Sequence, residues 1–139
     1  MNLNIMLANE LYSFGFSFRH YQKHHYQGMI YYYNDSEWVI GGEIGSRMSN
    51  LDLEIINNGI WLPSEEHLIE WLKDNDFVFA IINLDGFFEL QCKDSITCTE
   101  YYTKVPTLDL ALATIIRKIL KKQERPFDTK DKIYGVIED

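Results

Sequence analysis

The fold is decided by residues 64–122, which read SEEHLIEWLKDNDFVFAIINLDGFFELQCKDSITCTEYYTKVPTLDLALATIIRKILKK. Ser64 is a good N-cap residue, and apolar residues at positions 68, 71 and 72 predict a short helix that ends at residues 73–75. A second helix begins after Thr107, because apolar residues then recur at the spacing of one helix face. They are Leu108, Ala111, Leu112, Ile115, Ile116 and Ile119.

Between these helices the sequence predicts three strands, at residues 77–84, 87–93 and 96–103. Asp85-Gly86 is a strong hairpin signal, since a type I′ turn needs positive φ at both central residues. The first strand, FVFAIINL, is apolar on both faces, which is typical of an interior strand. The second strand alternates apolar and polar side chains, so one of its faces is expected to meet solvent.

Residues 1–59 predict a helix over 3–14 and then a β-meander with strands at 18–26, 29–33, 38–44 and 51–56. Residues 123–139 follow as a tail. The chain is therefore expected to form a single α+β domain over residues 1–139. Its antiparallel sheet would carry an N-terminal helix, a central helix and a long C-terminal helix, with 60–122 as an α-β-β-β-α unit.

The net charge of −8, from 13 basic and 21 acidic residues, argues against direct binding to nucleic acid or to anionic membranes. It suits a basic protein partner. The N-terminal residues lack the pattern of a secretion signal, and no apolar run is long enough to span a membrane. Two cysteines, Cys92 and Cys98, do not make a disulfide framework, so we expect a cytoplasmic protein in which both are small buried side chains.

Three patterns in the sequence bear on metal binding, phosphate binding or acid–base catalysis. His20, His24 and His25 resemble a zinc motif, but on a strand positions i and i+4 lie about 13 Å apart, too far to share one ion. The glycines of residues 41–46 lack the lysine of a phosphate loop and predict a bulge or a close backbone approach. His67 lies beside two glutamates on a first helical turn that we expect to be solvated. The sequence therefore nominates no catalytic, cofactor-binding or metal-ligating residue.

The predicted meander offers the candidate partner-binding residues. Tyr31 and Tyr33 would share one face of a strand, and the preceding strand carries too many polar side chains to be wholly buried. Exposed tyrosines are typical of interface hot spots, so the candidates are Tyr21, Tyr31, Tyr33, His20 and His24. The alternative is that the N-terminal helix covers the tyrosines and makes them part of the core.

Two stretches carry a resemblance to a known family. They are WLPSEE at residues 61–66 running through EWL at 70–72, and TLDLAL at 107–112 running on to residue 120. The region 61–120 resembles the small phage-encoded ABA-sandwich proteins of Gram-positive bacteriophages and prophages. Residues 1–56 depart from that pattern. The resemblance implies phage origin and assigns no active residue.

The same α-β-β-β-α order matches that of double-stranded RNA-binding domains. Such domains grip phosphates with basic groups at a helix N-terminus and in a loop. Here Asp109 opens the last helix, and residues 64–122 carry ten acidic against seven basic side chains, which argues against RNA binding.

The leading hypothesis is a non-enzymatic accessory protein of phage or prophage origin that binds, and could inhibit, a basic host protein. The alternative is an immunity or antitoxin-type protein that neutralises a toxin, for which an acidic chain is equally suited. A small hydrolase or nucleotide-binding protein comes third. The partner's identity and the oligomeric state do not follow from the sequence.

Overall fold

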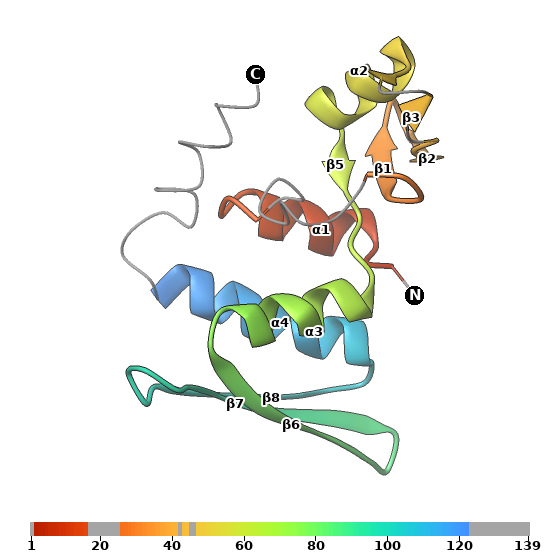
Figure 1. Ribbon diagram of the computed structural model, residues 1–139. Coiled ribbons are helices and arrows are strands. Elements are labelled where there is room, and N and C mark those ends of the chain that lie inside the picture. The colour runs from red at the N-terminus through yellow and green to blue at the C-terminus, as the bar shows by residue number, and fades with distance from the viewer. Residues whose placement is uncertain (1, 17–25, 42, 45–46, 123–139) are drawn as a thin grey trace. The chain divides into compact units, whose positions relative to one another are not determined.

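The chain folds into two compact units, each of which joins helices to a small antiparallel sheet. The computed structural model describes residues 2–16, 26–41, 43–44 and 47–122 (Figure 1). One unit takes in residues 4–63, and the other takes in residues 2–3 and 64–122. The expected α+β class is confirmed.

The unit of residues 64–122 has the order helix, three strands, helix. Its elements are α3 (Glu65–Asp74), β6 (Phe77–Leu84), β7 (Phe87–Asp94), β8 (Glu100–Val105) and α4 (Leu108–Lys122). The strands form one antiparallel sheet in the order β6-β7-β8, with Leu84 opposite Phe87 and Leu90 opposite Thr103. Asp85 and Gly86 have φ values of 54° and 79°, so the predicted type I′ turn is confirmed.

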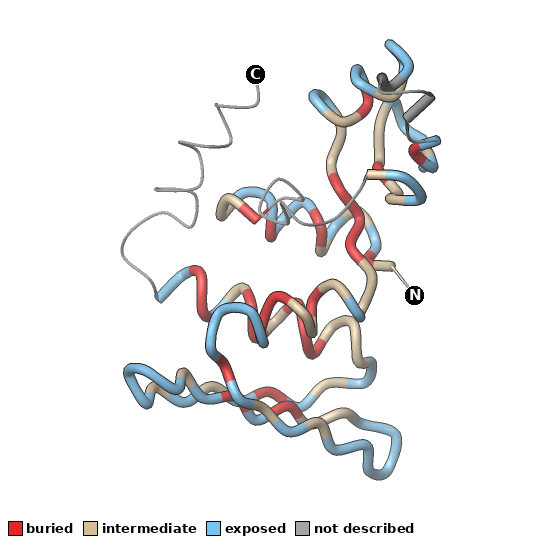
Figure 2. Tube along the Cα trace, viewed as in Figure 1, coloured by how far each residue is buried: buried red, intermediate tan, exposed pale blue. Residues whose placement is uncertain are grey.

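Both helices pack on one face of this sheet. The long helix α4 contacts β7 and β8, while α3 contacts β6 and α4 (Figure 1). The buried stripe of α4 contains Leu112, Ile115, Ile116 and Ile119, as the helical spacing predicted (Figure 2). The sheet contributes Phe77, Leu90 and Cys92 to the same core. The hydrophobic effect therefore fixes which face of the sheet is covered.

The unit of residues 4–63 begins with α1 (Ile5–Tyr12), whose N-cap Asn4 accepts a hydrogen bond from the Leu7 N–H at 2.9 Å. Its larger sheet has the order β2-β1-β5, and its helix α2 contacts β1. A two-stranded pair, β3 and β4, completes the unit. The bounds are β1 (Ile30–Tyr33), β2 (Ser36–Val39), β3 (Glu43–Ile44), β4 (Arg47–Met48), α2 (Asn50–Asn58) and β5 (Ile60–Trp61).

Three predictions about the strands are corrected. Residues 51–56 belong to the helix α2, because the Ser49 side chain caps it by accepting from the Asp52 N–H at 3.0 Å. The run 38–44 is divided between β2 and β3. The run 96–103 became β8 only from Glu100 onward, because Asp94 accepts from the N–H groups of residues 96 and 97 and turns the chain. The predicted strand 18–26 lies almost wholly outside the described residues, as does the tail 123–139.

The strand β6 is not interior. Within the described part of the chain it pairs only with β7, and β7 is the central strand. Its second apolar face is therefore the outer face of the sheet, on the side opposite to α3 and α4. None of the described helices is both long enough and apolar enough to cross a membrane.

Candidate functional site

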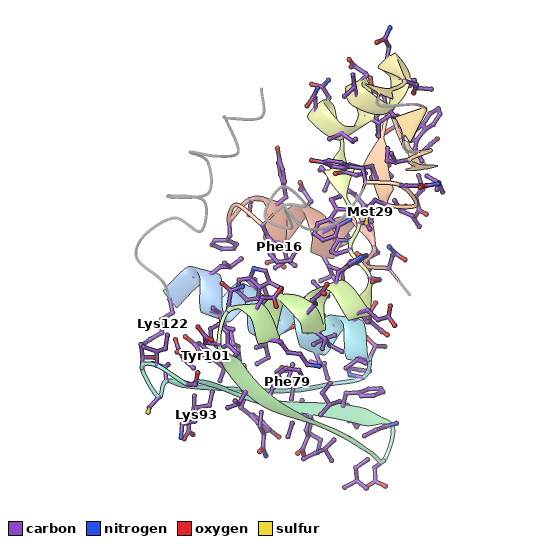
Figure 3. All side chains as sticks on the ribbon, in the orientation of Figure 1. Phe16, Met29, Phe79, Lys93, Tyr101 and Lys122 are labelled. Atoms are coloured by element: carbon purple, nitrogen blue, oxygen red, sulfur yellow. The ribbon has the colours of Figure 1, made fainter. Side chains whose placement is uncertain are left out.

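The candidate site is the face of the β6-β7-β8 sheet that points away from α3 and α4, called here the outer face. Side chains alternate along each strand, so this face takes every second residue. Figure 3 shows Phe79 and Tyr101 on the helix side of the sheet and Lys93 on the opposite side. The outer face consists of Val78, Ala80, Ile82, Leu84, Phe87, Glu89, Gln91, Lys93, Glu100, Tyr102 and Lys104.

An apolar strip runs along the β6 side of this face. The side chains of Val78, Ile82, Leu84 and Phe87 are between 38% and 61% exposed. Leu84 lies opposite Phe87 across the hairpin. Ile82 follows two residues away along β6, and Val78 four residues further, with Ala80 between them. Exposed apolar residues scattered singly are normal on a protein surface, whereas a contiguous strip is typical of an interaction site.

Charged side chains of both signs cover the β7 and β8 side. Lys104 Nζ lies 3.9 Å from a Glu89 carboxylate oxygen and 5.5 Å from the centroid of the Phe87 ring. Lys93 lies opposite Glu100 in the register of β7 and β8. Opposite charges across neighbouring strands stabilise the pairing modestly and leave this half of the face with no net charge.

Tyr102 lies on β8 between Glu100 and Lys104, opposite Gln91 of β7. Desolvation raises the pKa of its phenol, and the nearby Glu89 carboxylate raises it further. The phenol stays protonated at neutral pH, and its hydrogen bond to Glu89 also raises its pKa. A shallow hollow of about 730 Å³ lies against it, with Val78, Ala80 and Gln91 in its lining. Such a surface can hold an apolar side chain of a partner.

His67 and Cys92 carry groups that can act in acid–base or nucleophilic chemistry, but both have structural roles. His67 Nδ1 accepts from the Ser64 N–H at 3.0 Å and completes a capping box at the start of α3. Burial, and then the Asp94 carboxylate, raise the pKa of the Cys92 thiol to about 11. A thiol with such a pKa is protonated at neutral pH and is a poor nucleophile. Cys98 is exposed in a turn with φ 67°, so the expectation that both cysteines are buried is wrong for Cys98.

Tyr31 and Tyr33, the two tyrosine candidates that the structure describes, differ in how far they are buried. Tyr31 is 4% exposed and belongs to the core of its unit, so the expectation that its ring faces solvent is wrong. It lies on the middle strand of its sheet, opposite Trp38 on one side and Trp61 on the other. Tyr33 is half-buried, and its hydroxyl donates to the Glu54 carboxylate at 2.8 Å. Tyr33 thus remains a candidate contact residue, and its link to Glu54 fixes its ring.

The other sequence candidates cannot be placed. Tyr21, His20 and His24 lie outside the described residues, as does His25 of the zinc-like pattern. Within the ranges that the structure describes, no three His, Cys, Asp or Glu side chains are grouped closely enough to hold a metal ion. In the glycine-rich stretch, the Gly41 N–H donates to the Asp52 carboxylate at 3.2 Å, whereas residues 42, 45 and 46 lie outside the described residues.

No protein-family model, no curated protein and no solved structure matches this chain. The functional proposal therefore depends on the geometry and charge of the chain itself.

The sequence contains a signal for the outer face that the predictions above missed. The polar half of the alternation in β7, Glu89, Gln91 and Lys93, predicts a solvent-facing side for the whole sheet. Side chains at paired positions of neighbouring strands lie on the same face of a sheet. The second apolar side of FVFAIINL must therefore lie beside those polar residues, exposed, once the hairpin at Asp85-Gly86 is accepted.

Proposed function

We propose that this chain is a non-enzymatic accessory protein that acts by binding another protein through the outer face of its β6-β7-β8 sheet. The observation that carries the proposal is the exposed apolar strip of Val78, Ile82, Leu84 and Phe87, on the same face of the sheet as the exposed Tyr102. Aromatic and apolar side chains with a polar rim are the usual composition of the centre of a protein interface.

The partner that fits best is a basic protein. The chain carries a net charge of −8, which attracts a basic protein over long distance and speeds the encounter. The outer face itself is neutral, since Glu89 and Glu100 balance Lys93 and Lys104. Charge would therefore guide the approach, while the apolar strip would provide the affinity.

The setting that we propose is the bacterial cytoplasm during phage or prophage expression. The resemblance of residues 61–120 to small phage-encoded ABA-sandwich proteins supports it. A basic host protein, inhibited by the accessory protein, is the partner class that combines this setting with the charge.

An immunity protein that neutralises a basic toxin is the second candidate. The same acidic charge supports it, because the inhibitor of a basic toxin gains from electrostatic complementarity. Gene neighbourhood distinguishes the two: phage modules flank an accessory gene, and a toxin gene flanks an immunity gene.

The test compares three baits in one host lysate. They are the unaltered chain, a Val78→Ser/Phe87→Ser variant of the outer face, and an Ile96→Ser control. Ile96 is 75% exposed in the connection between β7 and β8, so the control removes an equally accessible apolar side chain from the same unit but not from the outer face. Melting curves of all three establish that the baits are folded.

We expect a basic protein to be retained by the unaltered chain and the control, and lost from the outer-face variant. Titration of that purified protein should give an affinity about 30-fold weaker or more for the variant, as for loss of a hot spot worth about 2 kcal/mol. Binding should also weaken as salt is raised. Equal affinity for all three baits, or the absence of any selectively retained protein, would refute the proposal.

A further inference from the structure

The two edge strands of the β6-β7-β8 sheet differ in how they are protected. On β8, the Tyr102 carbonyl points away from β7 and accepts a hydrogen bond from Lys118 Nζ at 2.9 Å. A lysine over an edge strand blocks the approach of another strand. Among the described residues, no lysine covers the edge strand β6 in this way.

The hydrogen-bond pattern shows which β6 backbone groups point outward. The Ser95 N–H donates to the Asp76 carbonyl at 3.0 Å, which marks residues 76 and 95 as a hydrogen-bonded pair. In an antiparallel ladder such pairs recur at every second residue. In the observed register the pairs that follow are those of Val78, Ala80, Ile82 and Leu84 with β7. The N–H and C=O groups of Phe77, Phe79, Ile81 and Asn83 therefore point away from β7.

This edge also lacks the protective features that edge strands usually carry. Over its eight residues β6 has no charged side chain, no proline and no interruption of its register with β7. A long, regular, apolar edge is a template for another strand. An unpaired edge strand of this kind leads to uncontrolled association. In a native protein it therefore points to a defined second strand that pairs with it.

We propose that the occupant is β6 of a second copy of this chain, paired antiparallel about a two-fold axis at Ala80. In this register Phe79 lies opposite Ile81 of the second copy, and Phe77 lies opposite Asn83 of the second copy. It is the register in which each of the four outward-pointing residues meets another of the four, so that every outward N–H and C=O of the strand is bonded.

The side chains suit the same register. On the outer face, Val78 meets Ile82 of the second copy, and the small Ala80 meets its own symmetry mate at the closest point. On the helix side, Phe79 and Ile81 are only half-buried within one copy and gain cover from each other across the axis. Each subunit presents the same patch to the other, as a two-fold interface requires.

Charge favours contact at this edge over other surfaces. Two copies that each carry −8 repel one another, and a stretch of eight uncharged residues is where they approach at least cost. The capped edge of β8 then ends the assembly. The product is a closed dimer with one six-stranded sheet and not an open filament. The dimer leaves the outer face uncovered, so it does not depend on the function proposed above.

A charge introduced at the axis tests the pairing. Ala80→Lys places two like charges directly opposite each other in the dimer, while in one copy the new side chain points to solvent from the outer face. The matched control is Gln91→Lys, which puts the same charge on the same face one strand further from the axis. Ala80→Glu supplies the complementary partner.

Sedimentation of the full chain, from about 1 μM to about 500 μM, should show conversion from the 16.4 kDa monomer to a species of twice that mass. Ala80→Lys should weaken the dimer about tenfold or more, whereas Gln91→Lys should change it little. An equimolar mixture of Ala80→Lys and Ala80→Glu should restore the dimer. A monomer at all concentrations, a larger assembly, or equal effects of the two lysine variants would overturn the proposal.

Hydrogen exchange gives a readout that needs no variant. The amides of Val78, Ala80 and Ile82 bond to β7 and should be protected at every concentration. Those of Phe79 and Ile81 should exchange fast in dilute protein and become protected only as the dimer forms. Full protection of Phe79 and Ile81 in the dilute monomer would place another segment of the same chain on this edge and would overturn the proposal. Protection that appears only with an added foreign protein would do the same in favour of that protein.

Discussion

Replacement of Ile115 with alanine tests the packing of α4 against its sheet. Ile115 is fully buried in the middle of the apolar stripe that faces β7 and β8. The substitution removes three carbon groups. At about 0.8 kcal/mol for each buried group, the transfer term alone is about 2.4 kcal/mol. The cavity that remains adds to this, so we expect a loss of about 3 kcal/mol within the observed range of about 2–5 kcal/mol.

Urea denaturation followed by circular dichroism measures this loss. A unit of this size has a urea slope of about 1–1.5 kcal/mol per molar, so the midpoint should fall by about 2–3 M. That is a large share of a total stability of about 5–15 kcal/mol. The control is Ile96→Ala, which removes the same groups from an exposed side chain and should cost less than about 0.5 kcal/mol. Equal midpoints for the two variants would refute the packing of Ile115 in the core.

Further outcomes concern the thiols, a helix cap and the tyrosines. At neutral pH an alkylating reagent should modify Cys98 at once and Cys92 only after unfolding, since Cys92 is buried with a raised pKa of about 11; prompt modification of two thiols per chain would contradict this. The folded Cys92 keeps its proton to higher pH than the unfolded thiol does. Its contribution to stability should therefore be complete below the unfolded pKa and be lost as the pH rises toward about 11, and denaturation midpoints in that pH window measure the loss. Ser64→Ala should cost about 1 kcal/mol, because it removes the side-chain acceptor of the His67 N–H at the start of α3; an unchanged thermal midpoint would argue that the cap contributes nothing. Tyr31→Ser should lower the melting temperature strongly, because it empties a core position, whereas Tyr33→Phe should leave it nearly unchanged, and the reverse order would restore Tyr31 as a surface residue.

The sequence by itself determined the elements whose signals are local. Ser64 begins α3, and the apolar spacing from Leu108 to Ile119 predicts α4 and its buried face. The turn at Asp85-Gly86 sets the register of β6 and β7. Each of these depends on residues within one or two turns of the chain, where backbone preference and side-chain periodicity act directly.

Tertiary structure alone decided the order of the strands and the burial of particular rings. The apolar run of β6 has the composition of an interior strand, yet its place at the edge depends on which strands pair with β7, a contact between distant residues. Tyr31 is buried because its strand lies in the middle of a sheet whose other members come from later in the chain. Residues 51–56 have the alternation of a strand but form part of α2, because Ser49 caps that helix. The open edge of β6 is a consequence of strand order, so it became visible only once the whole sheet was in place.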